Sequence, residues 1–201
     1  MVAFGTALAL WGNKTNLTAR PQDAARTVFH IVDSLMLLAL ARDRQIAGLA
    51  GTFGEGRRVL DFGSGAGFPG LVLASASEAR FTLSESRRRR ASFLTVAAHE
   101  MALDNVEIIA ARISHSTVSR TYDAVLSRAS GPSPEFYALA SNALVPGGVA
   151  ILYASPSQRL DLAAARTAGL IDYRHYPYAV RRPDGAVERL LAVWRMPEKA
   201  A

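Results

Sequence analysis

Residues 58–73 of this 201-residue chain read RVLDFGSGAGFPGLVL, and they decide the fold. The apolar run at 59–62 contains a β-branched residue and is bounded by glycine, as in a buried parallel strand. Gly63, Gly65 and Gly67 follow, at a turn where the backbone must bend sharply and approach a ligand closely. The next pair, Phe-Pro, opens a helix, because proline is favoured in a first helical turn. Strand, glycine loop and helix together predict the first half of a nucleotide-binding crossover.

The spacing of the glycines narrows the class of ligand that the loop can bind. A dinucleotide fingerprint reads G-x-G-x-x-G, whereas here the glycines run G-x-G-x-G with Asp61 two residues ahead of the first. The chain contains no G-x-x-x-x-G-K-[ST] sequence, which excludes a phosphate-binding P-loop. The form D-x-G-x-G-x-G resembles the first motif of class I S-adenosylmethionine-dependent methyltransferases. That resemblance implies that Gly63 and Gly65 pass under the amino-acid end of the cofactor.

Composition limits the remaining chemistry. Cysteine is absent, which excludes disulfides, cysteine nucleophiles and cysteine metal sites. The net charge is +6 and the pI about 10.2, which favours a polyanionic partner. The four histidines lack metal-ligand spacing, so we predict no metal; they are His30, His99, His115 and His175.

The N-terminal residues give no sign of export. Residues 1–11 are apolar, but they lack the basic region of a signal peptide and are too short to span a bilayer. We also expect no apolar run of about 18 residues. The sequence therefore predicts a cytoplasmic protein without membrane contact, and we expect a monomer.

Apolar periodicity predicts a helix from Asp23 to Arg44. His30 and Asp33 lie one turn apart on it, and from spacing alone we expect a surface or helix-bonding arrangement. A glycine-rich linker at 48–57 follows. We predict an N-terminal helical segment at 1–47 and one compact domain at 48–201.

The rest of the chain alternates short strands with helices and ends in an antiparallel hairpin. The predicted fold is α/β: a Rossmann-like class I methyltransferase with a mostly parallel seven-stranded sheet, a closing antiparallel hairpin and a short N-terminal helical appendage. The predicted strands are 59–62, 80–83, 106–109, 123–127, 149–153, 173–180 and 188–194, and the helices between them are 69–77, 134–144 and 158–168.

Strand ends supply further candidates, since ligands of such sheets bind outside the carboxyl ends of the strands. Glu85 follows the second strand about 20 residues beyond the glycine loop, where a carboxylate binds ribose hydroxyls. It also suits a helix N-terminus, where the dipole favours an acid. Ile113, Ser114 and Arg128 follow the third and fourth strands and are predicted to belong to the same site.

Four consecutive arginines, Arg87, Arg88, Arg89 and Arg90, open the helix after the second strand. Consecutive helical positions fan around the axis, so the four cannot all face one ligand. We expect one or two to be solvated or packed against the fold and the others to bind phosphate. The net charge of the chain favours nucleic acid as the source of that phosphate.

Taken together, these segments resemble the glucose-inhibited division protein B family, bacterial methyltransferases that modify guanine N7 of 16S ribosomal RNA. The resemblance covers residues 11–195. It rests on WGNKTNLT (11–18), HIVDSL (30–35), VLDFGSGAGFPG (59–70), ESRRRRASFL (85–94), LDNV (103–106), LSRA (126–129), PGG (146–148) and ERLLAV (188–193).

The resemblance implies S-adenosylmethionine as cofactor and ribosomal RNA or the small ribosomal subunit as partner. It places cofactor contacts on Gly63 and Phe68, the adenine near Ile113 and Ser114, and Arg128 toward the methionine end. Glu85 stands where the family often has an aspartate, which keeps the carboxylate.

Three departures from the family pattern fall on the side expected to face RNA. The family usually has a longer N-terminal helical extension. An arginine often precedes the histidine, where this chain has Phe29. An L-K-G triplet usually follows the fifth strand, where this chain has Tyr153-Ala154-Ser155 and so lacks the lysine. Arg174 or Arg182 would have to supply charge there.

Methylation of guanine N7 needs no general base, because the lone pair carries no proton; alignment and electrostatics suffice. An amine or hydroxyl acceptor would have to lose a proton, and His30 or Asp33 would then be the base candidates. Two alternatives stay open: a paralogue that methylates a small molecule such as a purine or amine, and a non-catalytic RNA-binding relative.

Overall fold

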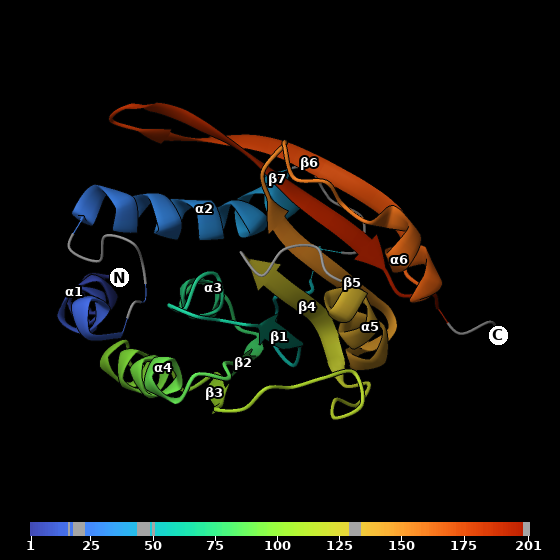
Figure 1. Ribbon diagram of the computed structural model, residues 1–201, viewed down its shortest axis with the longest axis horizontal. Helices are drawn as coiled ribbons and strands as arrows, with labels where there is room; N and C mark the ends of the chain where they lie inside the picture. Colours follow the sequence, from blue (N-terminus) through green and yellow to red (C-terminus); the bar gives the residue numbers. More distant parts are fainter. Residues whose placement is uncertain (16, 18–22, 44–48, 50, 129–133, 199–201) are drawn as a thin grey trace.

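The structure is a computed structural model that describes residues 1–15, 17, 23–43, 49, 51–128 and 134–198. Within them the chain alternates helices and strands as predicted (Figure 1). The helices are α1 (Val2–Thr15), α2 (Ala24–Asp43), α3 (Gly70–Ala74), α4 (Arg88–Glu100), α5 (Pro134–Ala143) and α6 (Leu162–Thr167). The strands are β1 (Arg58–Phe62), β2 (Arg80–Ser84), β3 (Val106–Ile109), β4 (Tyr122–Arg128), β5 (Leu144–Ala154), β6 (Ile171–Arg182) and β7 (Gly185–Arg195).

The described strands form one seven-stranded sheet in the order β3-β2-β1-β4-β5-β7-β6. β1 to β5 pair in parallel, β7 pairs antiparallel with β5, and β6 pairs antiparallel with β7. The predicted fold class and closing hairpin are thereby confirmed. Strand order reverses between β1 and β4, and a doubly wound sheet binds its ligand at such a switch point.

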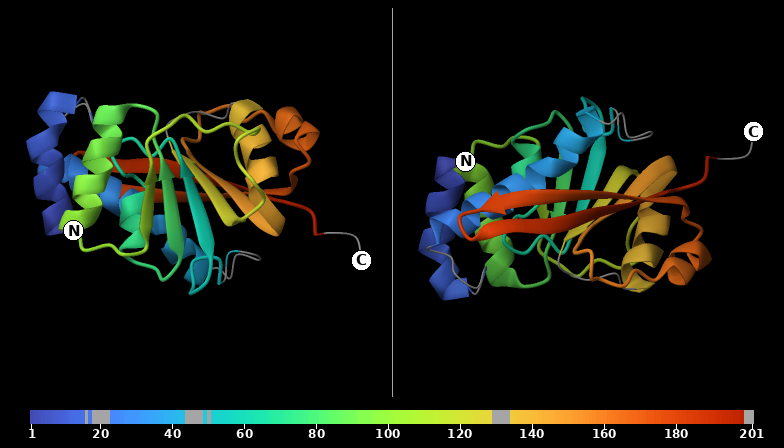
Figure 2. Two further views of the ribbon diagram at one scale, coloured as in Figure 1. Left: turned by 90° about the horizontal axis from the view of Figure 1, so that it is seen from below. Right: turned by 90° about the horizontal axis from the view of Figure 1, so that it is seen from above.

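Both faces of the sheet are covered, which explains why the adjacent residues Val59 and Leu60 of β1 are both apolar and buried. Val59 packs into a core shared with α1 to α4, whereas its neighbour Leu60 packs into a second core with α5 and α6. Figure 2 shows α1, α2 and α4 gathered at one end of the molecule and α5 and α6 at the other. Phe4 and Leu8 of α1 are fully buried in the first core, so the N-terminal helix packs on the α/β unit. The predicted boundary at 47 and 48 lies outside the described residues and stays a prediction.

The prediction was wrong at the fifth strand. The strand was predicted at 149–153, after the helix 134–144, but β5 begins at Leu144 and runs through Pro146, Gly147 and Gly148. The pairing of β4 with β5 is irregular here, because the register shifts between Tyr122 and Ala124. Gly147 has a φ of 77°, and a Cβ on Gly148 would lie 2.9 Å from the carbonyl oxygen of Val145. Glycines at an irregularity of this kind mark a bulge as well as a turn, and the sequence did not distinguish the two.

Several predicted helix bounds also need correction. α3 begins at Gly70, with Pro69 as N-cap, and is shorter than 69–77. α6 begins at Leu162, because the carboxylate of Asp161 accepts a hydrogen bond from the backbone of Ala164 and caps the helix there.

Averaged hydropathy singles out one helix that contains no uninterrupted apolar run of about 18 residues. Among the described residues, the segment Ala24–Arg42 of α2 is long and apolar enough to cross a membrane by length and composition, with a mean hydropathy of 1.5. A count of uninterrupted apolar residues stops at Arg26 and Asp33, whereas an averaged hydropathy tolerates both. Core helices of globular proteins pass the same test, and α2 packs against α3 and the hairpin strand β6.

The close approach of α3 to β1 gives the first testable prediction. A Cβ on Gly70 would lie 2.5 Å from Oδ2 of Asp61 and 3.0 Å from Cγ of Leu83, both in the core. Gly70→Ala should therefore lower the free energy of unfolding in urea by about 1–3 kcal/mol through overpacking. Gly5→Ala on α1 is the control: nothing lies within 4 Å of its Cβ, so it should raise stability by about 0.5–1 kcal/mol. Equal stability of the two variants would contradict this packing argument.

Candidate active site

The glycine loop lies at the carboxyl end of β1 and is tied to β2. The backbone N–H groups of Gly63 and Ser64 both donate to the carbonyl oxygen of Ser84, at 3.1 and 3.0 Å. Gly63, Gly65 and Gly67 have φ values of 74°, 55° and 84°, a region that L side chains rarely adopt.

Two of these glycines serve different needs. A Cβ on Gly67 would lie 2.6 Å from Leu71, so this glycine lets α3 pack against the loop. A Cβ on Gly63 would meet nothing within 4 Å, although Gly63 lines a cavity. The open space beside Gly63 is what a closely bound ligand requires, so this part of the loop fits the predicted cofactor.

Glu85 connects the loop to the next helix. One oxygen of its buried carboxylate accepts a hydrogen bond from the backbone of Gly65 at 3.1 Å, and the other accepts from Arg87 at 2.8 Å. The helix-terminal role of this acid is therefore real, because it satisfies an N–H at the start of α4. Each carboxylate oxygen keeps lone-pair capacity for a ribose hydroxyl, so the two predicted roles are compatible.

The predicted cofactor residues fall into two groups. Gly63, Glu85 and Ile113 line one cavity of about 210 Å³ at the carboxyl edge of the sheet. This volume is below the roughly 300–1,000 Å³ of a complete ligand site, so it fits part of a cofactor. Ser114 is adjacent in the chain but does not line this cavity; its hydroxyl lies 2.9 Å from that of Ser116.

The second group lies across the switch point between β1 and β4. The guanidinium of Arg128 stacks over the ring of Phe68, with 5.5 Å between Cζ and the ring centroid. The imidazole of His30, from α2, lies 5.2 Å from the same ring. An Nη2 hydrogen of Arg128 is donated to Nδ1 of His30 at 2.5 Å. Phe68 and Arg128 are thus in contact with each other, as predicted for one site, and His30 of α2 contacts both of them.

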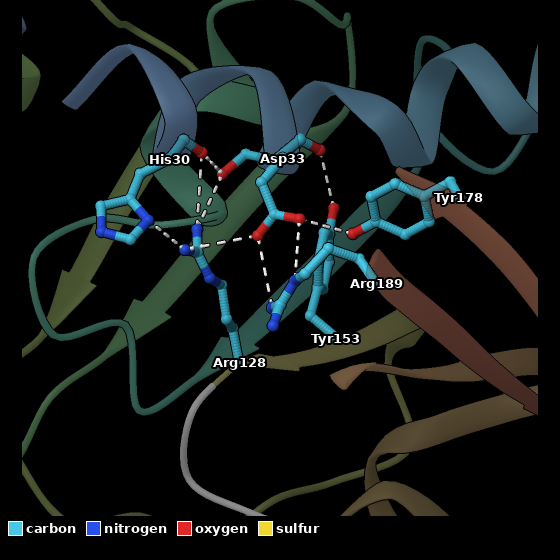
Figure 3. Close-up of polar contacts among 7 residues, drawn as sticks. His30, Asp33, Arg128, Tyr153, Tyr178 and Arg189 are labelled. Carbon is cyan, nitrogen blue, oxygen red and sulfur yellow. Dashed lines mark hydrogen bonds and ion pairs between the residues drawn. The ribbon is translucent and has the colours of Figure 1, made fainter. Parts of the chain in front are cut away.

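Asp33 is the centre of this second group (Figure 3). Its side chain is fully buried, with one oxygen 3.3 Å from Nη2 of Arg128 and the other 3.1 Å from Nε of Arg189 on β7. The hydroxyl of Tyr178 on β6 also donates to Asp33, at 2.7 Å. One turn of α2 therefore joins the end of β4 to the closing hairpin. The expectation of a surface or helix-bonding pair was wrong for Asp33, because the carboxylate is paired far from its own helix.

A sequence signal for this burial exists on α2. Phe29, Asp33, Leu37 and Leu40 are all buried and follow helical spacing. An acid within an apolar stripe is almost never buried unless it is paired, so the position predicts a cationic partner without identifying it.

Burial also changes proton affinities at the site. The pKa of His30 is lowered to about 4, first by burial and then by the charge of Arg128. The pKa of Asp61 on β1 is raised to about 7, mainly by burial. One oxygen of Asp61 accepts from the backbone of Gly70 at 3.0 Å, whereas the other has no hydrogen-bond partner among the described residues. Asp61 was predicted only as part of the glycine motif, and its carboxyl was not among the predicted site residues.

The four consecutive arginines differ in exposure, as expected for neighbouring positions on a helix. Arg87, Arg88 and Arg89 are exposed, whereas Arg90 is half-buried with its Nη1 close to Gly65. The start of α4 is held to the glycine loop, because Glu85 accepts hydrogen bonds from the backbone of both Gly65 and Arg87. Of the two replacements considered for the missing lysine, Arg182 pairs with Asp184 and stacks over Phe29.

The sheet topology, the glycine loop and the cavity at its carboxyl edge define a class I S-adenosylmethionine-dependent methyltransferase. The solved structures agree in fold. An S-adenosylmethionine-dependent O-methyltransferase from Thermotoga maritima has a TM-score of 0.55 at 16% identity, covering 85% of this chain and 72% of that one. A precorrin-6y C5,15-methyltransferase from Geobacter metallireducens has a TM-score of 0.57 at 13% identity, covering 81% and 86%.

Residues 1–177 match the family model described as rRNA small subunit methyltransferase G, and the chain belongs to this family. The family predicted from the sequence is thereby confirmed. A ribosomal RNA small subunit methyltransferase G from Cereibacter sphaeroides is 34% identical over 188 residues, covering 91% of this chain and 84% of the relative. Its namesake from Coxiella burnetii is 30% identical over 178 residues, covering 88% and 81%.

The buried position of Asp33 gives a stability prediction. Asp33→Asn leaves the two arginines without their counter-charge, so the free energy of unfolding in urea should fall by about 3–5 kcal/mol. Asp184→Asn is the matched control, since this carboxylate also pairs with an arginine but is exposed. It should leave stability close to wild type, because exposed pairs contribute little. An equal loss of stability in the two variants would contradict a structural role for the burial of Asp33.

Proposed function

We propose that this methyltransferase transfers the methyl group of S-adenosylmethionine to guanine N7 of 16S ribosomal RNA, with the RNA or the small ribosomal subunit as partner. The family supports the RNA substrate: the relatives from Cereibacter sphaeroides and Coxiella burnetii are both named for the small ribosomal subunit. A ribosomal substrate also favours a cytoplasmic location, and we propose a monomer. The net charge of +6 and the exposed arginines of α4 suit a polyanion.

The observation that carries the guanine N7 proposal is the state of the two candidate bases. Nδ1 of His30 is occupied by a hydrogen bond from Arg128. Asp33 is paired with two arginines and a tyrosine hydroxyl. Neither group is free to take a proton from an amine or hydroxyl, whereas guanine N7 needs no deprotonation. This favours an acceptor that needs no deprotonation, such as guanine N7, over an amine or hydroxyl acceptor.

S-adenosylmethionine, when bound, supplies an electrophilic methyl group. We propose that Gly63, Gly65 and Phe68 hold its methionine end together with Arg128, and that Glu85, Ile113 and Ser114 hold the adenosine. Asp61 adds a carboxyl whose unpaired oxygen suits a cationic ligand. A positive ligand favours the ionised form of Asp61 and would lower its raised pKa.

The function is tested with purified protein and cofactor carrying a labelled methyl group. Labelled 7-methylguanosine in 16S RNA nucleosides, read by mass spectrometry, is the expected result. Label on free purines or amines with none on RNA would favour the small-molecule paralogue. Absence of cofactor binding in titration calorimetry would favour the non-catalytic RNA-binding relative.

Gly63→Val should weaken S-adenosylmethionine binding by more than about 100-fold, because its side chain enters the space beside the loop that a close-bound ligand needs. Gly56→Val is a matched control. Gly56 has a φ of 76° against 74° for Gly63, and its Cβ also meets nothing within 4 Å, but it does not line the cofactor cavity. Both variants should lose similar stability from the strained backbone, and only Gly63→Val should lose the cofactor. Equal affinities of the two variants for S-adenosylmethionine would contradict the assignment of the glycine loop to the cofactor site.

Replacing both Arg87 and Arg88 with alanine should weaken binding of 16S RNA and reduce the slope of log affinity against log salt by about 1–2. Cofactor affinity should not change, because Glu85 binds only the backbone of Arg87. Replacing Arg57, which pairs with Asp123 instead, with alanine is the control for loss of a cation elsewhere. An unchanged salt slope in the double variant would contradict the proposal that Arg87 and Arg88 bind RNA.

A further inference from the structure

His30 contacts both Phe68 and Arg128, the two residues proposed to hold the methionine end of the cofactor. It projects from α2 over the switch point between β1 and β4, 5.2 Å from the ring of Phe68 and bonded to Arg128 at the end of β4. Ligands of a doubly wound sheet bind at this place. His30 does not line the cavity beside Glu85, and its Nε2 lies on the side of the ring away from Arg128 (Figure 3).

The hydrogen bond from Arg128 fixes the form of the imidazole. A guanidinium can only donate hydrogen bonds, so Nδ1 of His30 must be the acceptor in their 2.5 Å contact. In a neutral imidazole with Nδ1 unprotonated, the proton is on Nε2. His30 therefore presents an N–H donor on the side of the ring away from Arg128, as Figure 3 shows.

That donor is available to a ligand. No hydrogen bond to Nε2 of His30 is present among the described residues, and the atom is not one of the buried polar atoms that lack a partner. The ring is half-buried between Phe29 and Phe68 and so has a fixed orientation. The lowered pKa, about 4, keeps the imidazole neutral at physiological pH. A neutral donor suits a base that becomes a cation on N7 methylation, because it adds no repulsion.

We infer that His30 determines base specificity: its Nε2–H donates a hydrogen bond to O6 of the target guanine. This inference rests on the proposed function. Guanine presents two acceptors on its major-groove edge, N7 and O6. N7 receives the methyl group, so O6 is the acceptor beside the reacting atom. Adenine has an amino donor in place of O6, and two facing donors would leave His30 unpaired and the base rejected.

The experiment pairs a change in the enzyme with a change in the base. The nucleotide that the wild type methylates in 16S RNA is first located by mass spectrometry. Small subunits are then reconstituted from ligated 16S RNA that carries either guanine or 2-aminopurine at this position. 2-Aminopurine keeps N7 and the 2-amino group but lacks O6. Initial rates of labelled methyl transfer give kcat/KM for each base, and calorimetry gives the affinity for S-adenosylmethionine.

The wild type should methylate guanine at least about tenfold faster than 2-aminopurine, the size expected for one hydrogen bond. His30→Phe keeps a ring of similar shape without the donor, so it should slow guanine by about tenfold and bring the two bases within about twofold. His30→Gln retains an N–H donor and should keep part of the preference. His99→Phe, an exposed histidine on α4, should keep all of it. Rates for both bases are measured at saturating S-adenosylmethionine, so that a change in cofactor affinity through Arg128, which His30 contacts, does not alter the ratio between the bases.

Equal slowing of both bases by His30→Phe would overturn the inference and make His30 a packing residue. A wild type that does not distinguish the two bases would overturn it as well. A wild type that leaves 16S RNA unmethylated would refute the proposed function, and with it this inference. That outcome is distinguishable because it appears in the wild type and not only in the variants.

Discussion

The site depends on one buried carboxylate. Asp33 belongs to the second helix, yet its partners are Arg128 at the end of β4 and Arg189 and Tyr178 on the closing hairpin. A buried ion pair of this kind adds little stability over an apolar core of the same shape, since desolvation offsets the attraction. Its consequence is geometric. With two cations and one hydroxyl converging on one acid, α2, β4 and the hairpin have a single low-energy arrangement.

That arrangement also determines which protons can move. Arg128 is shared between Asp33 and His30, so the pairing of the acid and the form of the imidazole are set by the same guanidinium. Tyr153 extends the contact, because its buried hydroxyl donates to the carbonyl oxygen of Ser34 at 2.7 Å. The network is built from groups that are already paired, and such groups orient a substrate better than they exchange protons with it.

The sequence predicted the local features well and the long-range partners poorly. The strand, glycine loop and Glu85 lie within 30 residues, and glycine spacing with apolar runs carries enough information to predict them. Asp33 and Arg189 are separated by 156 positions in the chain, and no local pattern records such a pairing. The buried stripe on α2 indicates that Asp33 needs a cation, but the basic chain offers 23 candidates. Only the closed sheet selects among them, by bringing the end of β4 and the hairpin to the same helix.

A methyltransferase can use a site in which every candidate base is already paired, because methyl transfer to guanine N7 removes no proton. Transfer from a sulfonium to guanine N7 breaks one S–C bond and forms one N–C bond, and the positive charge moves from the cofactor to the base. The total charge of the site does not change, so no new charge has to be stabilised and no proton has to be removed. The remaining barrier is one of alignment, which rigid positioning lowers most effectively. A neutral histidine held by Arg128 meets that requirement, because it offers a directional contact without adding charge next to the cation that forms.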